Sequence, residues 1–364
     1  MISEQLAAAL AAIGLTPAQR RHIDHLPAPP TAPFLRRVVE VQRDRLTLHD
    51  GEQESPARVL PALHLGAAAH DGLAVGDWVH AACDAHGQWW VHARVPPLNQ
   101  LARRQHDGRE KSTRAVIVSN VDTALLVMGL DHDFNLRRLE RYLALARIAG
   151  VQPVVVLTKA DLCDPAYAER RLHETCALMP PGVDVVALDA TGDEPSAALA
   201  PWTGPGQTLV MLGSSGAGKS TLTNALTGGA QRVGANRADD SRGRHITTAR
   251  SLHRMPGGAC IIDTPGLRTL RLDADAQDLV GVFDEIAQGA LRCRFRDCRH
   301  QGEPGCAVQD SVAPERLRNF HKMQRELQRD TLSALERKAQ RQVWKVRHKA
   351  ARARDRGKRE GERE

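Results

Sequence analysis

Two hydrophobic patterns divide the chain, and the first is typical of short β-strands. Over residues 34–97, runs such as FLRRVVEV, GDWVHAAC and QWWVHARV are separated by Gly, Asp and Pro. This spacing predicts a small barrel or sandwich, and about five strands indicate the OB type, a frequent nucleic-acid platform. Trp78, Trp89 and Trp90 are placed either to stack on bases or to fill the barrel core. Residues 1–33 predict a short helix and a Pro-rich linker, with one helix face made of Ile2, Leu6, Leu10 and Ile13.

From about Ser112 the apolar runs become nearly continuous and alternate with amphipathic stretches. The runs VDTALLVM, QPVVVLT, VDVVALDA, QTLVMLG and ACIID are typical of buried strands, and NLRRLERYLALARIAG and PAYAERRLHETCALM are typical of helices. Such alternation predicts a parallel sheet that is covered by helices on both faces. We therefore expect an α/β domain over residues 112–275.

The C-terminal part of the chain has a different composition. Residues 276–336 hold a Cys/His cluster, and from Pro314 the pattern predicts a long polar helix with charges all round. Residues 337–364 carry twelve Lys or Arg against four Asp or Glu, a local net charge of +8, while the whole chain has a net charge of +7. The basic character therefore belongs to this tail. The tail is expected either to be a solvated helix or to contact a nucleic-acid phosphate backbone.

The chain shows no signal for a membrane or for secretion. It has no run of about 18 apolar residues, so we expect no transmembrane helix and no membrane partner. The first stretch, MISEQLAAALAAIGL, has an early acidic residue and no basic leader, which favours an amphipathic helix over a secretory signal. Seven cysteines, three of them clustered with a histidine, do not form the disulfide framework of a secreted domain. We expect a cytoplasmic protein with one metal site.

The stretch GSSGAGKST follows an apolar strand and precedes a predicted helix, which is the context that a phosphate-binding loop requires. Its glycines allow backbone N–H groups to surround phosphates, and the helix N-terminus adds partial positive charge. Lys219 is expected to reach the β- and γ-phosphates, and Ser220 to ligate Mg²⁺. The candidate residues of this loop are Gly213, Ser214, Ser215, Gly216, Ala217, Gly218, Lys219, Ser220 and Thr221.

The motif DTPG ends the strand that comes after the phosphate loop. Asp263 is placed to hold Mg²⁺ through water, and the N–H of Gly266 is placed to contact the γ-phosphate. Between the two motifs lies GRHITTAR, a loop that we expect to become ordered when GTP is bound. A threonine of this loop is expected to complete the Mg²⁺ shell, and the pattern does not choose between Thr247 and Thr248.

The motif TKAD, at the end of the strand QPVVVL, is similar to the guanine-binding loop of GTP-binding proteins. Asp161 is expected to accept hydrogen bonds from the guanine N1–H and 2-amino groups, which adenine lacks. Lys159 is expected to lie along the base, followed by Ala160. Thr158 stands where such motifs usually have Asn, and its hydroxyl cannot reproduce both roles of an amide. The competing hypothesis is an ATP-dependent enzyme in which TKAD is a chance loop.

Leu267 follows DTPG at the position where many GTPases have a Gln that orients the attacking water. Since leucine cannot orient water, we expect slow intrinsic hydrolysis, with the water positioned by another group or by a partner. The candidate catalytic residues are Lys219 and His245, the latter in GRHITTAR. The alternative for His245 is a loop histidine that only touches solvent or a partner.

The stretch CRFRDCRHQGEPGC offers three thiolates and one imidazole within one short loop. These groups complete a tetrahedral shell with no open position, which predicts one structural zinc ion. The expected ligands are Cys293, Cys298, His300 and Cys306. The basic neighbours of the cluster are expected either to contact RNA phosphates or to solvate a small domain; they are Arg292, Arg294, Arg296 and Arg299.

The order of the motifs is informative in itself. TKAD comes before GSSGAGKST, GRHITTAR and DTPG, so every part of a GTP-binding domain is present in rotated order. A circular permutation explains this order, since the ends of a compact α/β domain often lie close together. Together with DHDFNLRRLERYL, DTPGLR and CRFRDCRHQGEPGCAV, these motifs resemble the ribosome small subunit-dependent GTPase A family over about residues 34–350. The resemblance implies an N-terminal OB-type β-barrel, a central circularly permuted α/β P-loop GTPase domain and a C-terminal zinc-binding α domain.

The same resemblance implies a function. Members of the family bind the 30S subunit and its 16S rRNA, act late in subunit maturation, and hydrolyse GTP to GDP when the subunit stimulates them. It carries the guanine, phosphate, Mg²⁺ and zinc roles over to the residues named above, and we expect a monomer. ALDA at residues 187–190 only loosely matches the Ser-Ala loop that usually supports guanine, and Ile246 stands where the family usually has Thr. The alternative function is a nucleotide-gated rRNA-binding assembly factor in which hydrolysis is incidental.

Overall fold

The fold is taken from a computed structural model, which describes residues 2–27, 31–42, 45–61, 72–106, 112–229, 250–264, 272–273 and 279–331. The remaining segments include four predicted site residues, which therefore lie outside the described residues: His245, Thr247, Thr248 and Gly266. Leu267 and the basic tail 337–364 also lie outside them. Within the described ranges, every helix is too short or too polar to span a lipid bilayer.

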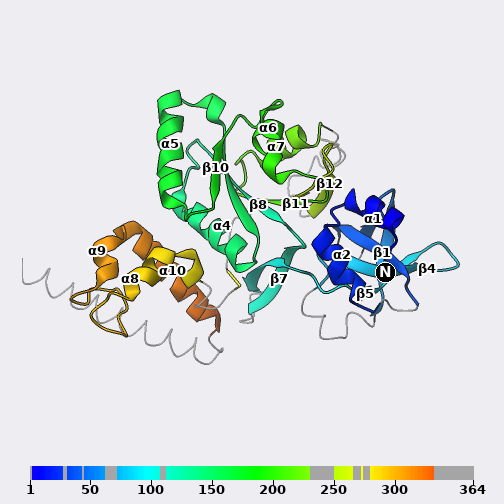
Figure 1. The fold of residues 1–364 in the computed structure, drawn as a ribbon, viewed down its shortest axis with the longest axis horizontal. Coiled ribbons are helices and arrows are strands. Elements are labelled where there is room, and N and C mark those ends of the chain that lie inside the picture. The colour runs from blue at the N-terminus through cyan, green and yellow to red at the C-terminus, as the bar shows by residue number, and fades with distance from the viewer. Residues whose placement is uncertain are drawn as a thin grey trace, which may run out of the picture.

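Five strands near the N-terminus form a closed barrel (Figure 1): β1 (Phe34–Val41), β2 (Leu46–His49), β3 (Glu54–Val59), β4 (Trp78–Cys83) and β5 (Trp89–Arg94). Strand β1 pairs antiparallel with both β2 and β4, and β3 pairs parallel with β5, so no edge of the barrel stays open. Val38, Leu48 and Val91 are fully buried inside it. The predicted five-stranded N-terminal barrel is confirmed.

The three barrel tryptophans have different environments. Trp78 is fully buried between the barrel and the N-terminal helices, as expected for a core residue. Trp89 is half-buried, and the guanidinium of Arg36 lies 3.7 Å from its ring centroid. Trp90 is also half-buried and donates a hydrogen bond to Asp84 at 3.0 Å. Core packing therefore accounts for Trp78 fully and for Trp89 in part, since Trp89 packs against the edge of the barrel core, but it does not account for Trp90.

Two helices precede the barrel, α1 (Glu4–Ala11) and α2 (Pro17–Asp24). Leu10 and Ile13 are fully buried against the barrel residues Leu35 and Trp78, so this segment is part of the barrel's packing. The helix α2 was not predicted from the sequence. Its start carries a capping box, in which the side chains of Thr16 and Gln19 bond to each other's backbone N–H.

The central sheet contains five parallel strands and one antiparallel strand, in the order β10-β9-β8-β11-β13-β12. The strands are β8 (Thr123–Gly129), β9 (Gln152–Thr158), β10 (Asp184–Ala187), β11 (Thr208–Leu212), β12 (Arg250–Arg254) and β13 (Cys260–Asp263). The helices are α4 (Leu136–Ile148), α5 (Pro165–Leu178), α6 (Glu194–Ala198) and α7 (Lys219–Leu226), with short 3₁₀ turns η2 (Ala160–Leu162) and η3 (Ala200–Trp202).

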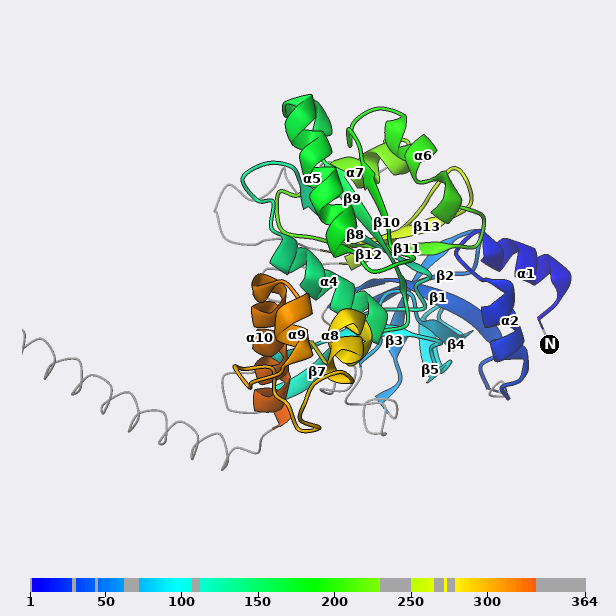
Figure 2. The same cartoon turned by 60° about the vertical axis from the view of Figure 1, so that its left-hand side comes forward.

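Alternate residues of the strands face opposite layers of helix, because side chains alternate across a sheet. Leu126 and Met128 pack with Leu143 of α4 on one face, whereas Leu125 packs with Leu222 of α7 on the other. Figures 1 and 2 show α4 and α5 on one side of the sheet and α6 and α7 on the other. The expected parallel sheet with two covered faces is confirmed.

The barrel and the central sheet are joined through one strand pair. Strand β12 pairs antiparallel with β1, with Glu40 opposite Ser251 and Val41 opposite Arg250, so the strands form one 11-stranded sheet. Arg37 of β1 is fully buried at this junction. Its guanidinium donates to the Thr208 hydroxyl at 2.9 Å and to the Asn120 carbonyl at 3.0 Å, and also to the Ile13 carbonyl. One side chain thus links the N-terminal segment, the barrel and the central sheet.

An antiparallel hairpin of β6 (Gln100–His106) and β7 (Ser112–Ser119) connects the barrel to the central sheet. This hairpin was not predicted from the sequence. The carboxylate of Asp273 accepts hydrogen bonds from Arg104 at 2.9 Å and from Arg114 at 2.8 Å, which anchors the hairpin to a segment that follows β13.

The C-terminal helices pack on the outside of α4 (Figure 2): η4 (Val280–Val282), α8 (Asp284–Ala290), α9 (Ala307–Ser311) and α10 (Pro314–Thr331). The prediction that charges surround the last helix is wrong for α10. Its apolar residues recur at helical spacing and are buried in the core shared with α4; they are Leu317, Phe320, Met323 and Leu327. At the same interface, Arg316 and Asn319 donate hydrogen bonds to the buried carboxylate of Glu140 on α4.

Candidate functional site

The candidate phosphate loop, residues 213–218, connects the fully buried strand β11 to α7. Gly216 and Gly218 have φ angles of 84° and 88°, a region that favours glycine. A Cβ at Gly213 would lie only 2.6 Å from the carbonyl oxygen of Val127, so a larger residue does not fit there. The glycines predicted to shape this loop therefore occupy positions that demand glycine, and the loop ends at the N-terminus of a helix, where anions are stabilised.

Lys219 begins α7 and is 7% exposed. Its ammonium donates to the carbonyl oxygens of Gly213 at 3.0 Å and Ser214 at 2.6 Å, so it lies inside the loop. Burial lowers the pKa of Lys219, while the nearby carboxylates of Asp263 and Asp133 act to raise it. A buried cation enclosed by this loop is suited to hold a phosphate group.

Two oxygen ligands suited to Mg²⁺ lie at the ends of neighbouring elements. Ser220 is exposed in the first turn of α7, and Asp263 ends β13, the strand next to β11. Burial raises the pKa of Asp263, whereas Lys219 and the backbone N–H of Thr264 lower it. The hydroxyl of Thr264, the second residue of DTPG, donates to the Met211 carbonyl at 2.6 Å, which connects this motif to β11. A hydroxyl and a carboxylate beside a phosphate loop fit a hard cation such as Mg²⁺.

The candidate guanine loop follows β9 and lies directly against the phosphate loop. Thr158 is fully buried, and its hydroxyl donates to the Ala217 carbonyl at 2.7 Å. A Cβ at Gly218 would lie 3.2 Å from the same hydroxyl oxygen, which shows how closely the two loops pack. Strand order places both motifs at one edge of the sheet, and this hydrogen bond joins two of their residues that are 59 positions apart in the sequence.

The other residues of TKAD lie at the surface beside this contact. Lys159 has a φ of 63°, and its ammonium pairs with Asp131 at 2.6 Å. The backbone N–H of Ala160 contacts the Leu188 carbonyl at 3.5 Å, so the ALDA stretch lies next to TKAD. Asp161 is exposed within η2 and is accessible to a base.

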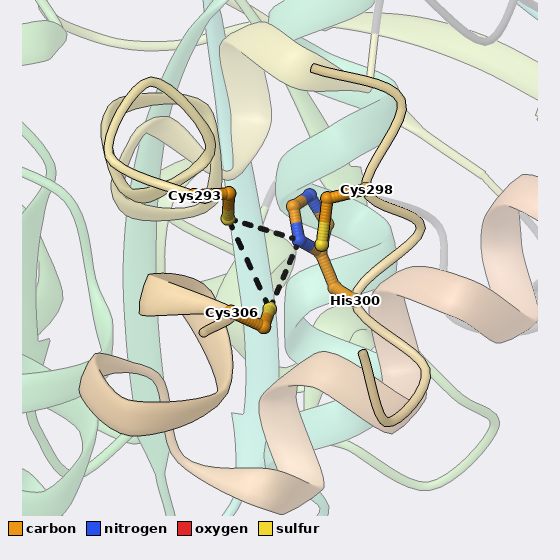
Figure 3. A group of neighbouring side chains, drawn as sticks. All are labelled: Cys293, Cys298, His300 and Cys306. Carbon is orange, nitrogen blue, oxygen red and sulfur yellow. Dashed lines mark hydrogen bonds between the residues drawn. The ribbon is translucent and has the colours of Figure 1, made fainter. Parts of the chain in front are cut away.

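The three thiols and the imidazole of the predicted zinc site are gathered in one place (Figure 3). All four candidate ligand atoms lie within 4.8 Å of one another. Cys293 Sγ and Cys306 Sγ are 3.9 Å apart, and His300 Nδ1 lies 3.3 Å from Cys306 Sγ and 3.7 Å from Cys293 Sγ. In a tetrahedral shell with Zn–S near 2.3 Å, sulfurs lie roughly 3.8 Å apart and nitrogen–sulfur pairs roughly 3.6 Å apart. The cluster therefore has the dimensions of a zinc shell.

The cluster fastens the C-terminal helices to one another. Cys293 follows α8, Cys306 is the residue before α9, and the His300 carbonyl accepts a hydrogen bond from His321 of α10 at 3.2 Å. The side chains around it form an exposed surface that is basic and partly apolar; they are Leu291, Arg292, Arg294, Phe295, Arg296 and Arg299. The predicted basic neighbours thus face solvent.

Two acidic residues at the site were not predicted from the sequence. Asp131 and Asp133 follow β8 and contact Lys159 of the guanine loop and Ser214 of the phosphate loop, respectively. A signal was available, because β8 lies between β9 and β11 and the carboxyl ends of parallel strands meet at one edge of the sheet.

The chain is similar to a family of known proteins. Residues 95–273 match the RsgA GTPase family. A curated relative from Xylella fastidiosa (strain 9a5c), named small ribosomal subunit biogenesis GTPase RsgA, is 45% identical over 303 residues, which cover 80% of this chain and 85% of the relative. A relative of the same name from Mesorhizobium japonicum is 42% identical over 304 residues, covering 81% and 84%.

Two solved structures have a similar fold. YjeQ from Thermotoga maritima superposes with a TM-score of 0.58 and 25% identity, covering 80% of this chain and 98% of that chain. YloQ, described as a circularly permuted GTPase, superposes with a TM-score of 0.54 and 23% identity, covering 82% and 96%.

Proposed function

The chain belongs to the RsgA GTPase family, and we propose that it binds the small ribosomal subunit late in maturation and is released when GTP is hydrolysed. Family members are GTPases, which hydrolyse GTP to GDP and phosphate, and the relatives are named for biogenesis of the small subunit. The partner in this proposal is the 30S particle with its 16S rRNA. The protein acts as a monomer in the cytoplasm.

One observation carries the proposal: the hydroxyl of Thr158 bonds to the Ala217 carbonyl at 2.7 Å. It holds the candidate base loop against the candidate phosphate loop, although the first precedes the second in the chain. A nucleotide needs both loops at once, one for the base and one for the phosphates. The contact therefore supports a complete GTP site in a circularly permuted domain.

In this site, Asp161 accepts the guanine hydrogen bonds, and Lys159 lies along the base. Backbone N–H groups of residues 213–218 and the ammonium of Lys219 bind the phosphates. Ser220, Asp263 and either Thr247 or Thr248 hold Mg²⁺, which offsets phosphate charge when bound. Gly266 contacts the γ-phosphate.

The group that positions the attacking water is either His245 or a residue of the subunit, since Leu267 cannot orient water. Stimulation by the subunit follows if the partner completes this part of the site. We propose His245 as the first residue to test.

The zinc cluster, with Cys293, Cys298, His300 and Cys306 as ligands, is proposed to be structural because four ligands leave no open position. The exposed arginines around it are proposed to contact rRNA phosphates, together with the basic tail 337–364. Removing the tail should weaken RNA binding and reduce the dependence of RNA affinity on salt concentration. An unaltered salt dependence would mean that the tail only aids solubility.

The proposal is tested by measuring GTP turnover with isolated 30S, 50S and 70S particles. We expect strong stimulation by 30S alone, and Lys219→Ala should remove both basal and stimulated turnover. Equal turnover with and without 30S would sink the proposal in favour of a nucleotide-gated rRNA-binding factor. Leu267, which lacks the usual water-orienting amide, is compatible with either function.

A GTP-dependent change in the C-terminal region is part of the same proposal. DTPG is followed closely in the chain by the zinc-bearing helices, so a loop ordered by the γ-phosphate is tethered to them. We expect 30S affinity to differ between GDP and a non-hydrolysable GTP analogue. Equal affinities would mean that the nucleotide does not control attachment.

A further inference from the structure

The loop DHDF, residues 131–134, occupies a central place at the candidate nucleotide site. It follows β8, which lies between β9 and β11 in the sheet. Strand β9 leads into the guanine loop and β11 leads into the phosphate loop. The loop therefore lies at the one strand end that adjoins both of the others.

The first carboxylate of the loop is directed to the guanine loop. Asp131 Oδ2 pairs with Lys159 Nζ at 2.6 Å, while Asp131 Oδ1 accepts the backbone N–H of Asp133 at 3.0 Å. Lys159 has a left-handed backbone, which is unfavourable for a residue other than glycine. The ion pair with Asp131 joins the side chain of Lys159 to the DHDF loop.

The second carboxylate is directed to the phosphate loop. Asp133 accepts a hydrogen bond from the hydroxyl of Ser214, the second residue of the phosphate loop. Arg138 of α4 fixes the carboxylate through two hydrogen bonds of 2.8 and 2.9 Å. Burial acts to raise the pKa of Asp133, but the hydrogen bonds from Ser214 and Arg138 outweigh it and lower the pKa.

A purely local role for Asp133 does not account for these contacts. The start of α4 is capped by Asn135, whose side chain accepts the N–H of Arg138 at 3.1 Å, so Asp133 is not needed as a cap. The residue that it contacts in the phosphate loop is 81 positions away in the sequence. The contact therefore joins the DHDF loop to the phosphate loop and is not needed to cap α4.

We propose that Asp133 is a positioning residue for nucleotide binding, which acts by holding the phosphate loop through Ser214. Together with the Asp131–Lys159 pair, it sets the separation between the phosphate loop and the guanine loop. This inference rests on the proposed nucleotide site. The affected ligands are guanosine di- and triphosphates, since both need the two loops at a fixed separation.

The experiment measures the affinity of the full chain for a fluorescent GDP analogue. Asp133→Ala should weaken binding by roughly tenfold, because a charge-assisted hydrogen bond is lost. Asp133→Asn keeps an acceptor for the Ser214 hydroxyl and should restore most of the affinity. Asp193→Ala is the matched control, since Asp193 is exposed and its side chain makes no capping hydrogen bond.

A double-mutant cycle tests whether the residue acts through Ser214. Ser214→Ala should weaken binding about as much as Asp133→Ala, and the double variant should be no worse than either. Three outcomes would each overturn the inference. The losses in the double variant could be additive, Asp133→Ala could bind with unchanged affinity, or Asp133→Asn could bind as weakly as Asp133→Ala. Failure of the unaltered chain to bind the analogue would instead refute the proposed nucleotide site. If Asp133→Ala does not fold, Asp133→Asn and Ser214→Ala still decide the matter.

Discussion

The hydroxyl of Thr158 donates a hydrogen bond to the carbonyl oxygen of Ala217, at 2.7 Å, and both residues are fully buried. The loss of the usual asparagine at position 158 therefore does not separate the base loop from the phosphate loop. A smaller side chain links the two candidate loops, while Asp161 of the same motif is exposed within η2.

This contact makes Thr158 testable. Thr158→Val keeps the shape but leaves the Ala217 carbonyl without this donor, so GDP affinity should fall by about 1 kcal/mol, or roughly fivefold. Thr158→Ser keeps the hydroxyl and should stay close to the unaltered chain. Titration calorimetry with GDP measures both, and an unchanged affinity in the valine variant would mean that the loops do not depend on this bond.

Asp161 is expected to choose the base. Asp161→Asn replaces an acceptor by an amide, which pairs better with the carbonyl of xanthine than with the guanine amino group. The ratio of GTP to XTP affinity should change by on the order of 10³. Asp164→Asn is a matched control, because Asp164 caps α5 by accepting the Tyr167 N–H and asparagine caps equally well. If Asp161→Asn still preferred GTP to XTP, the assignment of Asp161 to the base site would be wrong.

Lys219 predicts a pH dependence of nucleotide binding. Burial lowers its pKa in the free protein, and a bound phosphate would raise it again by opposite charge. As pH rises through the pKa of free Lys219, the side chain becomes neutral, and binding then requires proton uptake. GDP affinity should therefore decline toward alkaline pH below the ordinary lysine pKa of 10.5. Lys219→Arg should bind more weakly but lack this decline, since arginine stays charged; parallel pH profiles would contradict the role of Lys219.

The metal site predicts a local loss of structure. Cys298→Ala removes one of four ligands, so zinc content should fall from one equivalent per chain to near none. Hydrogen exchange should then accelerate between residues 293 and 311 while the central sheet stays protected. Cys83→Ala is the control, because Cys83 is exposed and belongs to the barrel. Normal zinc content in Cys298→Ala would disprove the ligand assignment.

The junction around Arg37 predicts a stability effect far from the nucleotide. A Cβ at Gly14, where φ is +91°, would lie 1.8 Å from Arg37 Nη1 and 2.5 Å from the Thr208 hydroxyl oxygen. Gly14→Ala should cost about 2–3 kcal/mol in urea unfolding. Gly87→Ala has a similar φ of +80° but open space, so it measures the backbone strain alone. Equal losses of unfolding free energy in the two variants would show that Arg37 and Thr208 can move to accommodate the added methyl group.

The elements that the sequence predicted well are those whose signal is local. Strands β8, β9 and β11 are buried on both faces except at Gln152, so most of their residues are apolar and the strands are easy to identify. The candidate phosphate loop and the Cys/His cluster could be proposed from the sequence because all of their residues lie within short stretches, and the structure gathers the four Cys/His side chains in one place. For α10, the apolar stripe was overlooked among many charges, although its spacing was present in the sequence.

Features that depend on distant residues were not predictable in the same way. The pairing of β12 with β1 joins Ser251 to Glu40, and no local pattern specifies that a barrel strand continues another sheet. The contact between Asp133 and Ser214 depends on strand order in the folded sheet. Such contacts depend on the order of strands in the folded sheet, which cannot be deduced from local patterns in a single sequence.

The position of Arg37 has a consequence for how the protein is made. Its guanidinium belongs to the first barrel strand, but its hydroxyl partner, Thr208, is encoded 171 residues later. At about 5–20 residues per second, the ribosome adds that partner roughly 10–30 s after Arg37. During this interval the guanidinium of Arg37 has to stay hydrated, although the finished protein buries it completely. We therefore expect the first segment to reach its final packing only after translation has passed the strand that leads into the phosphate loop.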